Sequence, residues 1–286
     1  MQTTELTITD AVVARMANAT SPRVREISEA LVRHLHAFVR EVEPTLEEWF
    51  AGIDFLTRTG QMCSPTRQEF ILLSDTLGVS MLVDSINHRV PGGATETTVL
   101  GPFYVADPPE QPLGADISAG KPGERLLVLG TVRGVSGEPV AGAVVDTWQS
   151  DSEGYYDVQL EGAELALRAR FRADGEGRFS FWSLVPSSYP IPDDGPVGHM
   201  LRQQGRHPYR PAHVHFRIGA PGYEELVTHV FVAGDEYLDS DVVFGVKESL
   251  VHELERHEPG TAPDGTAVDT PYAVLRYDFV LAGSAR

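Results

Sequence analysis

The chain has 286 residues, of which 42% are hydrophobic, so it is long enough for two domains and can bury a sizeable core. Its 23 basic residues face 41 acidic ones, and the resulting formal charge of −18 disfavours nucleic acid and anionic membrane surfaces as partners. The one cysteine, Cys63, excludes a disulfide within the chain and is interpreted as a small apolar filler. With no signal peptide or membrane span recognised in the sequence, we expect a soluble, cytoplasmic protein.

The first hundred residues are predicted to be helical. Ser21 and Pro22 form an N-cap and first-turn pair, and Pro44 ends the helix that they open. Within this helix the apolar residues recur every three or four positions and form one stripe: Val24, Ile27, Leu31, Leu35, Phe38 and Val42.

Two more helices are expected before residue 100. Thr45 and Glu48 match a capping box and open a helix that runs to about Thr59. Ser64-Pro65 opens a third, roughly from residue 66 to 86, with an apolar side made of Phe70, Leu73, Leu77, Met81 and Leu82.

Beyond residues 91–93, which read P-G-G, the chain changes to short β-like runs separated by glycine and proline. The predicted strands cover residues 126–132, 143–148, 171–173, 178–181, 213–218, 226–232 and 273–281. The tetrapeptide 174–177, D-G-E-G, is typical of a hairpin turn. The predicted fold class is therefore α+β, with an antiparallel β-sandwich after an N-terminal helical domain, and the boundary lies between residues 1–100 and 101–286.

Two long irregular segments, residues 151–167 and 185–211, interrupt the strands. Loops of this length in a compact domain are usually functional. Tyr155 and Tyr156 lie in the first segment, and Tyr189 lies in the second. Both segments follow directly after a predicted strand, so the sheet can position these side chains rigidly.

His213 and His215 are two residues apart in a predicted strand, so their imidazoles point to the same side. Such a pair can bind a transition metal, or it can be two ordinary half-buried histidines. Two phenolates together with two neutral imidazoles favour ferric iron, because hard anionic oxygen suits Fe(III) better than Fe(II), zinc or copper(I). Spacing alone does not choose between Tyr155 and Tyr156.

Several motifs resemble those of the intradiol ring-cleavage dioxygenases, the family of catechol, chlorocatechol and hydroxyquinol 1,2-dioxygenases. They are T-V-L-G-P-F-Y at 98–104, D-T-W-Q-S-D at 146–151 followed by G-Y-Y-D at 154–157, Y-P-I-P-D-D-G-P at 189–196, G-R-H at 205–207 and R-P-A-H-V-H at 210–215. The resemblance extends over nearly the whole chain.

The resemblance implies one Fe(III) per subunit, held by Tyr156, Tyr189, His213 and His215. It also implies two catalytic groups. Tyr189 is the ligand that a bound diol displaces and that accepts a proton, and Arg210 stabilises the negative charge that develops on the ring. His229 stands where catechol enzymes often have glutamine, and we expect a core or supporting histidine there rather than a fifth ligand.

Within the family the chain most resembles hydroxyquinol 1,2-dioxygenases. Benzene-1,2,4-triol and O2 would then give maleylacetate, and catechol or chlorocatechol is the alternative substrate. Asp75 is the expected contact for a third ring hydroxyl, although it can also be a solvated helix residue. The resemblance places further residues around the substrate: Leu72, Val99, Gly101, Pro102, Phe103, Ile191, Pro192, Arg210 and Val243. It also implies a homodimer formed through the N-terminal helices.

Two other classes of protein share part of this pattern. A transthyretin-like or carbohydrate-binding module would share the glycine-punctuated strands but would leave the tyrosines and histidines unexplained. A zinc hydrolase could use His213 and His215, but no acidic third ligand occurs at a familiar spacing such as H-E-x-x-H.

Overall fold

The computed structural model describes residues 4–64, 67–89, 92–160 and 165–284. The chain forms two compact units, Met1–Arg58 and Thr59–Arg286, and each is described on its own. Among the described residues, no helix is long and apolar enough to cross a membrane.

The first unit is helical, as the sequence predicts. It contains α1 (Ile8–Ala14), a 3-10 turn (Arg15–Asn18), α2 (Pro22–Val42) and the first part of α3 (Leu46–Gln61). The hydroxyl of Ser21 accepts a hydrogen bond from the backbone N–H of Val24, and this N-cap starts α2 as expected. Thr45 and Glu48 bond reciprocally, which confirms the capping box of α3.

The apolar stripe of α2 is exposed in the described part of the chain. All six residues of the stripe are between 47% and 58% exposed: Val24, Ile27, Leu31, Leu35, Phe38 and Val42. α2 has no buried residue at all. A continuous apolar stripe on an exposed helix is a feature of surfaces that bind another protein.

The third predicted helix is wrong in its extent. The structure has two short helices there, α4 (Glu69–Thr76) and α5 (Val79–Asn87), and Gly78 between them has a positive φ of 72°. The left-handed conformation at Gly78 ends α4 and changes the direction of the chain. The expected apolar side therefore does not form one buried face, since Phe70 and Leu82 are exposed whereas Met81 is buried. The predicted start at Pro65 lies outside the described residues.

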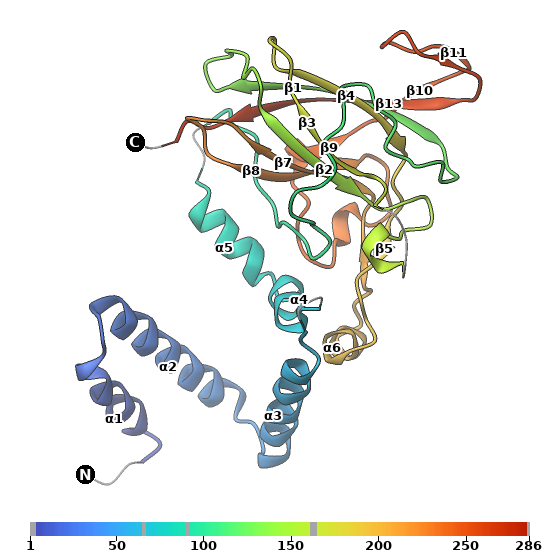
Figure 1. Cartoon of the computed structure of the whole chain (residues 1–286). Helices are drawn as coiled ribbons and strands as arrows, with labels where there is room; N and C mark the ends of the chain where they lie inside the picture. Colours follow the sequence, from blue (N-terminus) through green and yellow to red (C-terminus); the bar gives the residue numbers. More distant parts are fainter. Residues whose placement is uncertain (1–3, 65–66, 90–91, 161–164, 285–286) are drawn as a thin grey trace. The chain divides into compact units, whose positions relative to one another are not determined.

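The second unit is a β-sandwich of two mixed sheets (Figure 1). The four-stranded sheet has the order β10-β13-β1-β4, with bounds Glu255–His257, Tyr272–Leu281, Arg125–Gly134 and Arg178–Leu184. The five-stranded sheet has the order β3-β2-β7-β8-β9, with bounds Arg168–Arg172, Val144–Gln149, His213–Gly219, Leu226–Val232 and Val251–His252.

Two small ribbons complete the strands. β5 (Tyr189–Pro190) pairs with β6 (Tyr209–Arg210), and β11 (Gly260–Thr261) pairs with β12 (Ala267–Val268). The remaining short elements are α6 (Pro196–Gln203) and 3-10 turns at Asp157–Gln159, Leu238–Ser240 and Glu248–Leu250.

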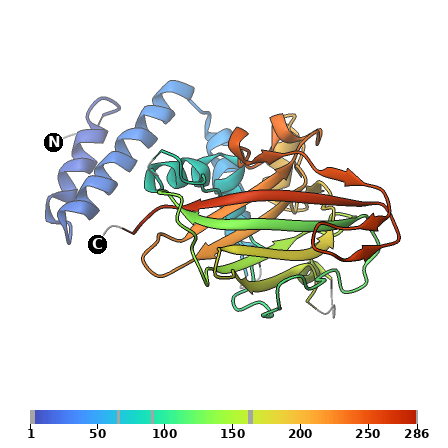
Figure 2. The same cartoon turned by 90° about the horizontal axis from the view of Figure 1, so that it is seen from above.

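The expected sandwich is confirmed, with two differences in its connections. β1 and β13 lie side by side (Figure 2) and run in parallel. β8 and β9 are also parallel, while the other main pairs are antiparallel. The predicted hairpin at 174–177 is wrong, because β3 and β4 on either side of it belong to different sheets. A tight glycine turn can close a hairpin or carry the chain from one sheet to the other, and its sequence does not distinguish the two.

The core lies between the two sheets. It is made of alternate residues on each strand, such as Leu126 and Val128 of β1 opposite Val214 and Phe216 of β7. The residues between them on β7, including His213 and His215, therefore face away from the core. This alternation places both histidines on the outer face of the five-stranded sheet.

Candidate metal centre and active site

The outer face of the five-stranded sheet carries a row of aligned aromatic side chains. His215 of β7 lies directly opposite Trp148 of β2 on one side and His229 of β8 on the other. The indole of Trp148 stacks on the imidazole of His215 with ring centroids 4.6 Å apart. Such stacking between neighbouring strands holds the imidazole at a fixed angle to the sheet.

Two tyrosines reach the same point from the long loops, as the sequence predicts. The hydroxyl of Tyr156 lies 2.9 Å from Nε2 of His215 and 3.3 Å from the hydroxyl of Tyr189. Nε2 of His213 lies 3.1 Å from Nε2 of His215. The four polar atoms therefore gather in one small region. Tyr155 is 49% exposed, so the choice between the two adjacent tyrosines falls on Tyr156.

Gly154 explains why the two loops can meet. Its φ is +88°, and an added Cβ would lie 3.0 Å from Cβ of Tyr189 and 3.1 Å from the carbonyl oxygen of Ser188. Only glycine combines this backbone conformation with so close a contact. The glycine thus lets the Tyr156 loop pack directly against the backbone that carries Tyr189.

The ligand candidates are buried, and their electrostatics suit a cation. Burial, together with the charge of Arg210, lowers the pKa of His213 to about 3, and burial also places the pKa of His215 well below its usual value. Both imidazoles are therefore neutral and free to bind a metal. Burial raises the pKa of Tyr156 well above its usual value, so this phenol needs a bound cation to ionise near neutral pH.

The hydrogen bonds of His213 also match those of a metal ligand. Its Nδ1 lies 2.6 Å from the carbonyl oxygen of Pro211. A carbonyl accepts only, so the ring proton is on Nδ1 and the lone pair of Nε2 points into the cluster. His213 and His215, with His229 beside them, also form a group whose donor atoms are close enough to share one metal ion.

The spacing of the four atoms fits a single transition-metal ion. Ligand atoms bound at about 2.1 Å and separated by angles of about 90–110° lie about 3.0–3.4 Å from one another. Three of the six separations are hydrogen-bond contacts of this length: 2.9 Å for Tyr156–His215, 3.3 Å for Tyr156–Tyr189 and 3.1 Å for His213–His215. The residues present therefore fit a metal with two oxygen and two nitrogen ligands.

Arg210 is buried beside this cluster and is held by a carboxylate. Its Nε and Nη2 donate to the two oxygens of Asp241 over 3.1 and 3.2 Å, and its Nη1 lies 3.3 Å from Nε2 of His213. Burial of Asp241 raises its pKa, but the charge and hydrogen bonds of Arg210 outweigh burial, and the net effect lowers it. The pairing of β5 with β6 sets Arg210 directly opposite Tyr189. A permanent cation is thus aimed at the ligand cluster.

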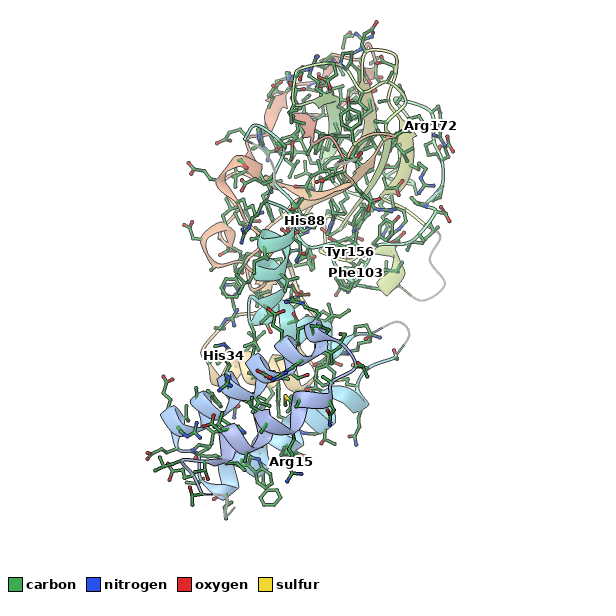
Figure 3. All side chains as sticks on the ribbon, turned by 90° about the vertical axis from the view of Figure 1, so that its left-hand side faces the viewer. Arg15, His34, His88, Phe103, Tyr156 and Arg172 are labelled. Atoms are coloured by element: carbon green, nitrogen blue, oxygen red, sulfur yellow. The ribbon has the colours of Figure 1, made fainter. Side chains whose placement is uncertain are left out.

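A second buried ion pair involves the residue that follows Tyr156 in the chain. The guanidinium of Arg168 binds both carboxylate oxygens of Asp157, the residue after Tyr156, and both side chains are 2% exposed. Nη1 of Arg168 also donates to the carbonyl oxygen of Phe103 over 3.0 Å. The ring of Phe103 stacks on that of Tyr156 at 4.4 Å, and the two labelled residues lie together in Figure 3. Arg168 therefore holds both neighbours of Tyr156: Asp157, which follows it in the chain, and Phe103, which stacks on its ring.

The residues predicted around the substrate are brought together in part. Leu72, Ile191 and Val243 share one buried apolar cluster. Gly101 has a φ of +79°, and an added Cβ would lie 3.2 Å from Cε1 of His215. Phe103 contacts the rings of Tyr156 and Tyr189. Of the remaining predicted pocket residues, Pro102 is exposed, and Val99 and Pro192 are partly exposed.

Asp75 is 6% exposed, so the interpretation as a solvated helix residue is wrong. It lies on the buried side of α4 with Leu72, one helical turn away. Burial raises its pKa, a hydrogen bond with Ser80 lowers it, and the charges of Arg210 and Asp241 also act on it. The carboxyl group therefore belongs to the same buried polar region as the arginine.

Asp241 and Gly245 contribute to the site but were not identified from the sequence. Asp241 gave no signal, because a single aspartate in a loop has many ordinary roles. Gly245 supports it: its N–H donates to Asp241, and an added Cβ would lie 2.9 Å from Nη2 of Arg210. The place of His229 could have been recognised by pairing the predicted strands 213–218 and 226–232, which sets it opposite His215.

Comparison with known proteins agrees with this geometry. The family model described as "Dioxygenase" matches residues 99–283, and the one described as "Catechol dioxygenase N terminus" matches residues 21–95. A 6-chlorohydroxyquinol 1,2-dioxygenase of Cupriavidus pinatubonensis is 57% identical over 275 residues, covering 96% of each chain. A hydroxyquinol 1,2-dioxygenase of a Rhizobium species is 51% identical over 276 residues, covering 96% of this chain and 94% of the relative.

A solved structure is similar over almost its whole length. The hydroxyquinol 1,2-dioxygenase of Pseudomonas putida DLL-E4 superposes with a TM-score of 0.93 at 50% identity, covering 98% of this chain and 99% of that one. The chain belongs to the intradiol ring-cleavage dioxygenase family. It is accordingly an oxidoreductase of the ring-cleaving type, and the resemblance drawn from the sequence motifs is confirmed.

Proposed function

We propose that this enzyme cleaves benzene-1,2,4-triol with O2 between the two adjacent hydroxylated carbons, and that the product is maleylacetate. Both atoms of O2 enter the product, so no separate reductant is needed. The observation that carries the proposal is the series of close polar contacts Tyr189–Tyr156–His215–His213, in which neighbouring oxygen and nitrogen atoms are 2.9–3.3 Å apart, beside a buried arginine. The hydroxyquinol-cleaving relatives support the choice of substrate class.

The proposed cofactor is one non-haem Fe(III) per subunit, held by Tyr156, Tyr189, His213 and His215. When bound, a ferric ion would supply the positive charge that ionises the two phenols and attracts the adjacent hydroxyl oxygens of the substrate. Two hard phenolate oxygens support Fe(III), because they suit a trivalent ion better than Fe(II), zinc or copper(I).

Tyr189 is proposed as the group that moves a proton. Its hydroxyl lies 3.3 Å from that of Tyr156, and the pairing of β5 with β6 sets Tyr189 opposite Arg210. As a phenolate, its oxygen can accept a proton from a substrate hydroxyl. The burial of both tyrosines, 0% and 2% exposed, excludes water from this transfer.

Arg210 is proposed to stabilise the negative charge that the deprotonated substrate places on its ring and oxygens. Nε and Nη2 are bound to Asp241, whereas Nη1 points at the ligand cluster. A guanidinium that is already oriented and desolvated stabilises developing charge without reorganisation.

Asp75 is proposed to recognise the third hydroxyl of the triol. It lies on the same face of α4 as Leu72, whose side chain packs with Ile191 and Val243. A buried carboxyl group that bonds a substrate hydroxyl is left without that partner when the substrate lacks the hydroxyl, which disfavours catechol. Val99, Gly101, Pro102, Phe103 and Pro192 are proposed as the remaining wall of the pocket.

The domain roles are part of the same proposal. We propose that residues 1–100 form a dimerisation domain and that residues 101–286 carry catalysis. The uncovered apolar stripe of α2 supports a homodimer, because a second copy can bury it. A single cysteine in 286 residues supports the proposed cytoplasmic location.

The experiment that tests the function is aerobic turnover of benzene-1,2,4-triol, catechol and chlorocatechols by the purified protein, with product identified by mass. We expect a red-brown protein, from tyrosinate bound to ferric iron, that prefers the triol and releases maleylacetate. A preference for catechol with formation of cis,cis-muconate would replace the substrate but keep the enzyme class. A colourless, inactive protein that contains zinc or no metal would support a hydrolase or a binding module instead.

A further inference from the structure

We infer that His229 is a positioning residue for Arg210: it accepts a hydrogen bond from the guanidinium and, together with Asp241, aims the free edge of that group at the substrate. The inference rests on the proposed function and deepens it, because it explains how the charge-stabilising group is oriented. It concerns hydrogen-bond geometry and does not require a particular metal.

The hydrogen bonds of Arg210 divide into two edges. On one edge, Nε donates to Asp241 over 3.1 Å, and Nη2 donates both to Asp241 over 3.2 Å and to Nδ1 of His229 over 3.3 Å. On the other edge, Nη1 contacts Nε2 of His213 at 3.3 Å. When the lone pair of His213 is given to a metal, Nη1 no longer has this acceptor and can donate to the substrate.

Asp241 alone does not fix this arrangement. A carboxylate that binds Nε and Nη2 still permits the guanidinium plane to tilt about the line between the two groups. An acceptor on a different element, such as Nδ1 of His229 on β8, removes that freedom because it engages the second proton of Nη2.

The sheet holds His229 firmly in this place. It is 0% exposed and lies in register with His215, and its ring stacks on that of His213 with centroids 4.7 Å apart. Contact with both proposed ligand histidines makes a fifth ligand the natural alternative. The contact with Arg210 argues against it. The guanidinium takes the lone pair of Nδ1, and a metal ion on Nε2 would put the ring proton on Nδ1, where it would face the N–H of Arg210.

The geometry also fixes the tautomer. Arginine only donates, so Nδ1 of His229 must carry its lone pair and the ring proton must be on Nε2. This tautomer can be determined by spectroscopy, without substrate turnover. Nitrogen-15 correlation spectra of the full-length, metal-free protein should show an unprotonated Nδ1 and a protonated Nε2 for His229, and a proton on Nδ1 would overturn the inference.

Two substitutions separate positioning from ligation in the iron-loaded enzyme. His229→Leu removes the acceptor, and His229→Gln offers an amide oxygen in a side chain of similar reach. We expect His229→Leu to keep its iron and colour, to keep KM for the triol within about threefold and to lose kcat about tenfold or more. We expect His229→Gln to recover most of that loss.

Phe231→Leu is the matched control, because Phe231 packs against His213 and His229 on the same strand and offers no hydrogen bond. Its kcat should stay within about threefold of the parent. Loss of iron from His229→Leu would make His229 a ligand and overturn the inference, as would an unchanged kcat. If the parent enzyme turns over neither triol nor catechol, the proposed function fails, while the tautomer of His229 still decides the present inference.

Discussion

At the scale of single residues, the site depends on groups whose ordinary chemistry is altered by burial. Tyr156 and His215 contact each other at 2.9 Å, and both are 1% exposed or less. A phenol and an imidazole placed in this way bind a proton between them or a metal beside them. The proposed role as metal ligands is tested most directly by removing one group at a time.

Tyr156→Phe and His213→Ala are each expected to lose iron and the red-brown colour, because each removes one of four proposed ligands. Metal content and the visible absorption band measure the loss. Tyr155→Phe is the matched control, since Tyr155 is the adjacent tyrosine and is 49% exposed. Retention of iron and colour by Tyr156→Phe would exclude this tyrosine as a ligand.

Arg210→Ala is expected to keep iron but to lose about 10²-fold or more in kcat, the usual effect of removing a charge-stabilising donor. Arg210→Lys should restore little, because one ammonium group cannot bind both oxygens of Asp241 and also reach the substrate. Steady-state kinetics beside iron analysis measures both effects. Full activity of Arg210→Ala would remove the proposed role.

Asp75→Asn tests whether the carboxyl group of Asp75 recognises the third hydroxyl of the triol. The change keeps the size of the side chain but removes the carboxylate, so we expect kcat/KM for the triol to fall more than tenfold while that for catechol changes little. Ile71→Ala on the same helix is the control, because Ile71 is 54% exposed. Equal losses of kcat/KM for triol and catechol would argue that Asp75 supports the fold and does not recognise the third hydroxyl.

At the scale of elements, the sequence predicted what depends on local pattern and missed what depends on tertiary contact. The capping signals at Ser21 and Thr45 are local and were correct. Gly78 is also local, but a lone glycine is compatible with a continuous helix, so the break between α4 and α5 could not be inferred.

The same limit applies to the site. The alternation of β7 predicted that His213 and His215 share a face, and the structure confirms it. The family motif chose Tyr156 over Tyr155, which spacing could not do. The ion pair of Arg210 and Asp241 joins residues that are 31 positions apart in the sequence, and no sequence pattern predicts it.

One buried contact joins two elements of the proposed substrate pocket. Glu69, the first residue of α4, is 0% exposed and receives hydrogen bonds from Arg67 and from the backbone N–H of Val197 in the first turn of α6. A carboxylate at a helix N-terminus is favoured by the free N–H groups and the helix dipole. Glu69 therefore ties α4, which carries Leu72 and Asp75, to the segment that follows Tyr189.

Glu69→Ala is expected to lower the free energy of unfolding by about 2 kcal/mol, because it leaves the buried N–H of Val197 without its acceptor and leaves Arg67 with Asp194 as its remaining carboxylate partner. Urea unfolding of the iron-loaded protein measures it. Asp194→Asn is the control: Asp194 also binds Arg67, but its side chain is 68% exposed, so a change of less than about 1 kcal/mol is expected. Similar effects of both substitutions would contradict the special role of the buried carboxylate.

At the scale of the whole molecule, the exposed apolar faces are more extensive than a monomer explains. On α3, Trp49, Phe50, Ile53 and Leu56 are between 46% and 62% exposed, in addition to the stripe on α2. At a net charge of −18 the molecules repel one another, so association requires a specific apolar contact that outweighs this repulsion.

The proposed homodimer therefore predicts that a charge in the stripe separates the subunits. Leu35→Glu with Phe38→Glu, both on the exposed side of α2, should convert a dimer into a monomer in sedimentation velocity at micromolar concentration. Arg23→Glu, an exposed residue of the same helix outside the stripe, is the control and should stay dimeric. The residues of the proposed metal centre all lie in the second compact unit, so the monomeric variant should keep its iron and its colour. A parent protein that is monomeric, or a double variant that stays dimeric, would refute the proposed role of α2 in dimerisation.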